Sequence, residues 1–196
     1  MKNPSDVTAA IELGVDAIGV ILHADSPRLI TKNAAITLRK HIPSNVLFIG
    51  VFVDANFEMI QDYSVEIGLD VVQLHGSETN SFGRSLSTPF IKAIRVKEKS
   101  DIAKQLKLYP DACALLLEPY QKGSPGGNGM QLNLDIWPKN SKHKLILAGG
   151  LSASNLKNTL KQIHPFAVDL NSGVEKSPAV KDIALIEKAL NVISCD

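Results

Sequence analysis

The feature that most constrains the fold is a regular alternation along the chain, in which short β-branched apolar runs are followed by stretches of helical period. This pattern is typical of a parallel sheet covered by helices, because both faces of such a sheet are buried. Seven strands are predicted, at 16–22, 46–53, 71–75, 90–96, 112–118, 144–150 and 166–172. Eight helices are predicted, at 5–13, 32–41, 58–67, 78–86, 99–108, 134–137, 153–163 and 181–193.

Even spacing of these units over 196 residues predicts an α/β fold, a TIM (β/α)₈ barrel that is missing its first β-strand. The chain opens with Asn-Pro-Ser-Asp at 3–6, which is a helix-start signal with no strand before it. An open doubly wound sheet is the alternative. It ranks lower because glycine-rich turns follow the last two strands and not the first. We expect residues 1–196 to form a single barrel domain.

Charge and apolar content exclude some classes of partner. The formal net charge is +1, and lysine and arginine are scattered along the chain, so no nucleic-acid partner is expected. No apolar run approaches the length of about 18 residues that a membrane span needs, and we expect a cytoplasmic protein. The two cysteines, Cys113 and Cys195, make no disulfide framework and are interpreted as reduced thiols.

Polar residues follow several predicted strands, at the rim where parallel barrels carry their reactive groups. Arg28 in "HADSPR" could bind a carboxylate through two parallel hydrogen bonds, or it is a solvated surface charge. His75 in "QLHGSE" is either functional or a satisfied core histidine. Glu118 follows three leucines, so loss of solvation should raise its pKa and favour a general acid; the alternative is a surface glutamate. The glycine-rich segment 119–131 is interpreted as a mobile cover.

Two glycine-containing turns follow the last two strands. "LAGGLSASN" contains Gly149 and Gly150, and "LNSGVE" contains Gly173. Free backbone N–H groups in such turns, together with a helix N-terminus, can bind a phosphate without a cluster of cations. The alternative is that these glycines only permit tight turns.

Taken together, the motifs are specific enough to resemble one family. "DAIGVIL…SPRLI", "GVFVD", "QLHGSE", "KAIRV", "LLLE…GGNG", "LILAGGL" and "VDLNSGVEKSPAVKD" have the order and spacing of phosphoribosylanthranilate isomerases of tryptophan biosynthesis. The resemblance extends from Asn3 to about Leu190. It implies an Amadori rearrangement of N-(5-phosphoribosyl)anthranilate, a small phosphosugar, with no metal or cofactor. An acid protonates the ribose ring oxygen, and a base removes the proton at C2′. A monomer or a weak homodimer is expected.

The resemblance also implies roles for individual residues. Arg28 corresponds to the arginine that faces the anthranilate carboxylate, and Glu118 to the general acid. His75 and Asp169 correspond to polar positions that line the substrate pocket. The backbone phosphate site corresponds to Gly149, Gly150, Asn171, Ser172 and Gly173.

This sequence departs from the family pattern at three points. Glu118 stands where the family usually has aspartate, and a misplacement of about 1 Å can cost about 10²-fold in rate. Asn128 stands where threonine or serine is common. The first strand, which carries the cysteine that acts as general base, is absent, and neither Cys113 nor Cys195 is placed to replace it. Loss of such a base typically lowers the rate by about 10²–10⁴, so impaired turnover is expected.

Two explanations for the absent strand are open: a start assigned at an internal methionine, or a relative that has lost the strand. Either way, the strands at 16–22 and 166–172 should keep unpaired edges, which favour association or lower stability. The alternative function is a non-catalytic phosphosugar-binding barrel. A metal-dependent sugar-phosphate epimerase is disfavoured, because only His75 and His23 are candidate histidine ligands at the rim.

Overall fold

Strands and helices alternate along the computed structural model, which describes residues 1–120 and 130–194. The strands are Ala17–His23 (β1), Leu47–Phe52 (β2), Val71–Leu74 (β3), Phe90–Val96 (β4), Ala114–Pro119 (β5), Leu145–Leu147 (β6), Ala167–Val168 (β7), Glu175–Ser177 (β8) and Val180–Lys181 (β9). The α-helices are Pro4–Glu12 (α1), Lys32–Arg39 (α2), Phe57–Ile67 (α3), Asn80–Ser85 (α4), Lys99–Leu108 (α5), Ala153–Gln162 (α6) and Ile183–Ser194 (α7). Two short 3₁₀ helices are Leu134–Ile136 (η1) and Ser172–Val174 (η2).

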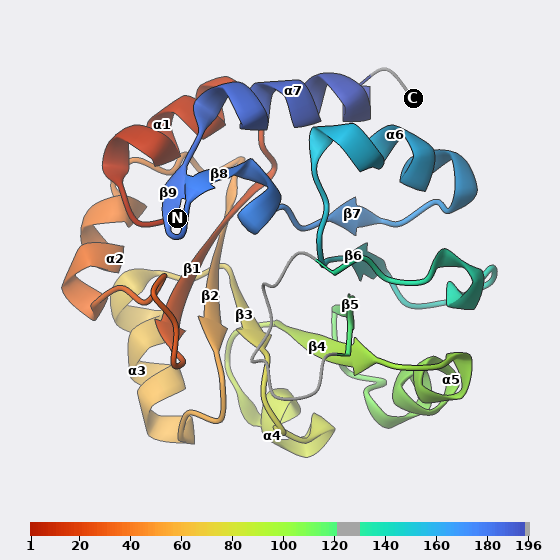
Figure 1. Cartoon of the computed structure of the whole chain (residues 1–196). Coiled ribbons are helices and arrows are strands. Elements are labelled where there is room, and N and C mark those ends of the chain that lie inside the picture. Colours follow the sequence, from red (N-terminus) through yellow and green to blue (C-terminus); the bar gives the residue numbers. More distant parts are fainter. Residues whose placement is uncertain (121–129, 195–196) are drawn as a thin grey trace.

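Seven parallel strands form one curled sheet in which neighbours in sequence are also neighbours in space. In the described residues the hydrogen-bonded order runs from β1 to β7 without a crossover, so β1 and β7 are the two ends of the sheet. The helices lie on its outer side (Figure 1). The seven predicted strands are therefore confirmed, and the arrangement is that of a TIM-type half-barrel.

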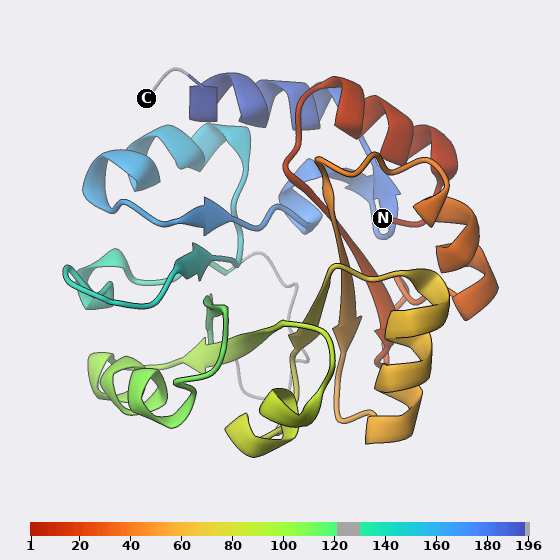
Figure 2. The same ribbon diagram turned by 180° about the vertical axis from the view of Figure 1, so that it is seen from behind.

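The helical layer continues around the molecule beyond the ends of the sheet. Helix α1 packs against both α2 and α7, and α7 packs against α6. The first and last helices lie side by side in both views (Figures 1 and 2). None of the helices in residues 1–120 and 130–194 combines the length and the apolar character that crossing a membrane requires.

The described residues contain seven α-helices, and not the eight that were predicted. At the sixth predicted position the chain forms only the 3₁₀ turn η1, because Asn133 caps a short segment and Pro138 cannot continue a helix. A small antiparallel hairpin of β8 and β9 was not predicted. It delays the start of α7 from residue 181 to Ile183.

Side chains on the inner face of the sheet change character along the strands. Six of them form a small apolar cluster, separate from the larger core between sheet and helices: Val71, Ile91, Ala93, Ala114, Leu116 and Ala148. Successive residues of a strand point to opposite faces, so every second residue continues this inner face. The next inward positions on β4 and β5 are Arg95 and Glu118. The apolar cluster therefore forms the floor beneath a polar site.

Candidate active site

Three polar side chains meet where the inner face reaches the carboxyl end of the sheet. Glu118 of β5 accepts a hydrogen bond from Arg95 of β4, with Nε and Oε1 separated by 3.2 Å. The same Oε1 atom lies 2.9 Å from Nε2 of His75, which follows β3. The structure thus brings together Glu118 and His75, which were both predicted to lie at this rim, and adds Arg95, which was not predicted.

The side-chain amide of Gln73 determines which nitrogen of His75 carries the proton. Nε2 of Gln73 lies 3.0 Å from Nδ1 of His75. An amide nitrogen only donates, so Nδ1 accepts, and in the neutral imidazole the proton is on Nε2. His75 therefore donates to Glu118. Gln73 is buried and lies on the same inward face as His75, two residues earlier.

Glu118 is shielded from solvent but is stabilised as a carboxylate. Burial raises the pKa of its carboxyl group, yet the hydrogen bonds from His75 and Arg95 outweigh burial and bring the pKa below the ordinary glutamate value. The sequence-based expectation of a raised pKa is therefore wrong. It considered loss of solvation and did not include the two donors.

Asp169 is a second carboxyl group close to this site. It follows β7, and its backbone N–H donates to the carbonyl oxygen of Leu147 at 2.8 Å. Burial raises the pKa of Asp169 above the ordinary aspartate value, against the opposing effect of His75 and Lys181. Asp169 is nevertheless exposed to solvent, which limits the effect of burial. The pKa shifts of the two groups have opposite directions, so a proton is held more readily by Asp169 than by Glu118.

Arg28 lies in the loop after β1 and is already paired. Its Nε donates to Oε1 of Glu175 at 2.8 Å, and its Nη2 donates to Oε2 at 2.6 Å. The bidentate geometry predicted for Arg28 is present, but its partner in the protein is Glu175. This ion pair raises the pKa of Arg28 and, against the effect of burial, lowers that of Glu175.

The turns after β6 and β7 pack directly against each other. A Cβ atom on Gly173 would collide with the carbonyl oxygen of Leu151, so η2 touches the turn that leads into α6. Gly149 has a φ of +95°, and Gly150 has a φ of +59°. The Asn155 side chain bonds to both the Gly150 carbonyl, at 2.7 Å, and the Ser152 N–H, at 2.9 Å. The predicted phosphate turns are thus neighbours in space.

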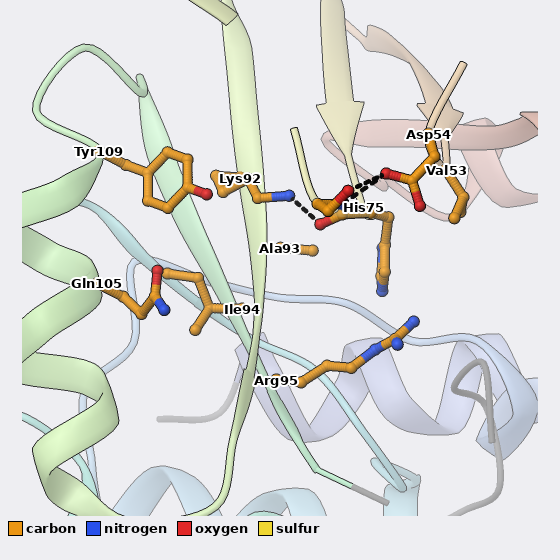
Figure 3. Close-up of a pocket in the computed structure, with 11 residues that line it drawn as sticks. Val53, Asp54, His75, Lys92, Ala93, Ile94, Arg95, Gln105 and Tyr109 are labelled. Carbon is orange, nitrogen blue, oxygen red and sulfur yellow. Dashed lines mark hydrogen bonds between the residues drawn. The ribbon is translucent and has the colours of Figure 1, made fainter. Parts of the chain in front are cut away.

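A cavity of about 410 Å³ extends from this site along β4. His75 and Arg95 form one wall, and Gln105 of α5 and Tyr109, which caps the end of that helix, lie on the other side of the strand (Figure 3). Asp54 also lines it and accepts hydrogen bonds from the Ser77 backbone and hydroxyl, each at 2.7 Å.

A buried ion pair supports the loop that carries His75. Lys92 Nζ lies 2.8 Å from Oε2 of Glu78, and both side chains are 3% exposed. Lys92 also donates to the Gly76 carbonyl at 2.6 Å, while Glu78 accepts from the backbone N–H groups of Gly76 and Asp54. Burial lowers the pKa of Lys92, and Glu78 partly offsets that effect. The loop after β3 is therefore bound to both β2 and β4.

Some residues of the site could have been predicted from the sequence, and others could not. Arg95 and Gln73 could have been found by counting alternate residues back from the rim, whereas Glu175 and Lys181 lie in the hairpin that was not predicted. Cys113 lies just before β5, far from the rim, as expected. The cover at 119–131 and Asn128 fall largely or wholly in 121–129, and Cys195 in 195–196, outside the described residues. Within the described part of the chain, no three His, Cys, Asp or Glu side chains are grouped to bind a metal ion.

Comparison with known sequences links the chain to one group of enzymes. A family model described as N-(5'-phosphoribosyl)anthranilate isomerase matches residues 1–192. The isomerase of Pseudomonas fluorescens (strain Pf0-1) is 37% identical over 188 residues, which cover 96% of this chain and 92% of that protein. The isomerase of Nitrosospira multiformis is 38% identical over 177 residues, which cover 90% of this chain and 85% of that protein.

Solved structures give the same result. The crystal structure of phosphoribosyl anthranilate isomerase from Thermotoga maritima has a TM-score of 0.88 and 28% identity, covering 100% of this chain and 96% of that one. A crystal structure of the isomerase in complex with reduced 1-(o-carboxyphenylamino)-1-deoxyribulose 5-phosphate has a TM-score of 0.84 and 29% identity, with coverage of 100% and 96%.

Proposed function

Because this chain belongs to the N-(5'-phosphoribosyl)anthranilate isomerase family, we propose that Glu118, Arg28 and the turns after β6 and β7 perform the reaction of that family. The reaction is an Amadori rearrangement within tryptophan biosynthesis. The aminoaldose N-(5'-phosphoribosyl)anthranilate becomes the ketose 1-(2-carboxyphenylamino)-1-deoxyribulose 5-phosphate. The ribose ring must open by protonation of its oxygen, and a proton must then leave C2′.

Glu118 is the proposed general acid, and its position on the inward face of β5 is the observation that carries this assignment. The carboxyl group is oriented by His75 and Arg95 at 2.9 and 3.2 Å. It is ionised before substrate binds, so it must gain a proton in the complex. The substrate brings a phosphate and a carboxylate, and nearby negative charge raises the pKa of a carboxyl group. Asp169 is the second carboxyl group that can carry a proton there.

The two anionic groups of the substrate have separate proposed sites. Arg28 binds the anthranilate carboxylate, since a guanidinium forms strong charge-assisted hydrogen bonds with carboxylates. The phosphate binds the backbone of the turns after β6 and β7, at Gly149, Gly150, Asn171, Ser172 and Gly173. Contact between these two turns through Gly173 and Leu151 supports their use as one site. His75 and Asp169 line the space between.

The base that removes the C2′ proton has no proposed residue in this sequence. We assign the gap between β1 and β7, the two ends of the described sheet, to an eighth strand that would complete a (β/α)₈ barrel, although the amino group of Met1 already donates to the Gly19 carbonyl of β1 there. The family resemblance places the cysteine base on that strand.

Glu118→Gln tests the acid. The variant removes the titratable carboxyl group but keeps the size of the side chain, so kcat should fall by about 10²–10⁴-fold. Turnover is followed by the loss of substrate fluorescence, and affinity by binding of the reduced product analogue, which should change little. Glu118→Asp should retain more activity than Glu118→Gln, because it keeps the carboxyl group.

Glu187→Gln provides the matched control, since Glu187 is exposed on α7 and the same chemical change there should leave kcat unaltered. Unchanged turnover in Glu118→Gln, combined with inactivity of Asp169→Asn, would transfer the acid role to Asp169.

A further inference from the structure

Glu175 lies between two cations that come from different parts of the chain. It begins β8 and faces Lys181 of β9 across the antiparallel hairpin. Its side chain is 4% exposed. Oε1 accepts a hydrogen bond from Lys181 at 3.1 Å and another from Arg28 at 2.8 Å, while Oε2 accepts from Arg28 at 2.6 Å. The two cations are thus connected by one buried carboxylate.

Lys181 connects this carboxylate to the loop after β7. Its Nζ donates to the backbone carbonyl of Asn171 at 2.8 Å and to the side-chain oxygen of the same residue at 3.0 Å. Asn171 immediately precedes η2, whose Gly173 packs on the turn after β6. A continuous chain of polar contacts therefore runs from Arg28 through Glu175 and Lys181 to the proposed phosphate turns.

The pairing with Glu175 also selects which side of Arg28 a ligand can use. Glu175 engages Nε and one hydrogen of Nη2. A guanidinium carries further N–H donors, and the second Nη2 hydrogen and both Nη1 hydrogens are not used by Glu175. The plane of the guanidinium is set by two parallel bonds, so these remaining donors point in a defined direction.

We propose that Glu175 is a positioning residue that sets the distance and orientation between the carboxylate-binding and phosphate-binding groups of the active site. This proposal rests on the proposed function, which assigns Arg28 to one end of the substrate and the turns after β6 and β7 to the other. Glu175 itself touches neither end. By fixing this spacing, Glu175 increases the affinity for ligands that carry both a carboxylate and a phosphate at the separation found in phosphoribosylanthranilate. Ligands that carry only one of these groups gain no such affinity.

Glu175→Gln tests the proposal, with three ligands measured by calorimetry: inorganic phosphate, anthranilate and the reduced product analogue that carries both groups. Binding two linked groups at once requires the correct spacing, whereas each group alone can adapt. We expect the affinity for the analogue to fall about tenfold and the affinity for each single ligand to change less than about twofold. In steady-state kinetics of Glu175→Gln, the relative increase in KM should exceed the relative decrease in kcat. Glu175→Asp, which keeps the charge, should lose less affinity.

Glu66→Gln is the matched control, because it removes a 2.8 Å ion pair with Lys32 on the outer helices and should change none of the three affinities. Equal losses for the analogue and for a single ligand would overturn the positioning role, as would an unchanged affinity for the analogue. Failure of the unmodified chain to bind the analogue would instead overturn the proposed function, and this inference with it. If Glu175→Gln does not fold, the Glu175→Asp comparison decides the question by the same criterion.

Discussion

At the scale of single residues, the direction of one hydrogen bond determines whether His75 presents a donor or an acceptor to Glu118. Gln73 donates to His75, so the imidazole presents its N–H, and not a lone pair, to the carboxylate. The amide of Gln73 makes no contact with Glu118 in this chain of bonds, yet it determines what His75 can donate. Gln73 therefore acts on the proposed acid through the histidine.

Gln73→Glu exchanges the donor for an acceptor of nearly the same shape. The new carboxylate would accept a hydrogen bond from Nδ1, so a neutral His75 would turn a lone pair toward Glu118 and the 2.9 Å contact would be lost. Because Glu118 would then be poorly oriented, kcat should fall by about tenfold to a hundredfold. The ¹⁵N chemical shifts of the imidazole report the tautomer directly.

Gln61→Glu is the matched control for Gln73→Glu. Gln61 lies on α3 and accepts hydrogen bonds from Ser87 through its side-chain oxygen, which glutamate retains. The added charge is the same, but it lies outside the site. An unchanged tautomer and unchanged kcat in Gln73→Glu would show that the amide does not set the orientation of His75.

The residues of the site could be predicted from sequence only where they follow a regular strand. His75 follows an apolar strand and Glu118 lies near the end of another, and alternation would also have indicated Arg95 and Gln73. The pKa of Glu118 could not be predicted, because its donors come from two other strands. Glu175 was also unreachable, since its cations are separated from it by 147 residues on one side and 6 on the other.

At the scale of elements, the contact between the turns after β6 and β7 depends on the absence of a side chain at position 173. Gly173→Ala would place Cβ against the backbone oxygen of Leu151, which cannot move like a flexible side chain. The two turns would have to separate. Overpacking of this kind costs about 1–3 kcal/mol, and the affinity for inorganic phosphate should fall as well.

Gly19→Ala makes the same chemical change where no atom lies within 4 Å of the new Cβ, so it controls for the loss of glycine flexibility. Chemical denaturation compares the free energy of unfolding of the two variants. If Gly173→Ala were as stable as Gly19→Ala and bound phosphate normally, the proposed single phosphate site would be wrong.

Element positions were well predicted, and their ends were not. Helix α4 was expected from residue 78 but begins at Asn80, capped by Thr79, because the Glu78 side chain is engaged with Lys92 and backbone N–H groups. The hairpin of β8 and β9 turns at Ala179, whose φ is +67°, unusual for a residue other than glycine. Tertiary contacts determine both details, so they could not be predicted from the local sequence.

At the scale of the whole molecule, the ring of helices is more nearly closed than the sheet inside it. Helices α1 and α7 are in contact, whereas β1 and β7 are the ends of the described sheet. The alternation of strands and helices was sufficient to predict this fold class, because a parallel sheet with short connections leaves few arrangements. Contrary to the expectation from the sequence, the outer edge of β1 is not bare, because Gly19 and Ile21 accept backbone hydrogen bonds from the Met1 amino group and the Ile30 N–H.

Adding an N-terminal strand that ends in Lys-Ile-Cys-Gly should fill the space between β1 and β7. The expected results are a higher melting temperature, less self-association in size-exclusion chromatography, and turnover raised by about 10²–10⁴-fold. The same extension with alanine in place of cysteine should improve stability but not turnover. If the 196-residue chain is already a stable monomer with rapid turnover, the assignment of that space to a strand is wrong.

The buried pair of Lys92 and Glu78 has a consequence for how this protein can change over generations. Removing either partner alone leaves a charge enclosed in the wall behind His75, and such losses typically cost about 3–5 kcal/mol. Lineages that replace one position would pass through poorly folded intermediates unless the other is replaced at nearly the same time. The two positions are therefore expected to change together in related sequences.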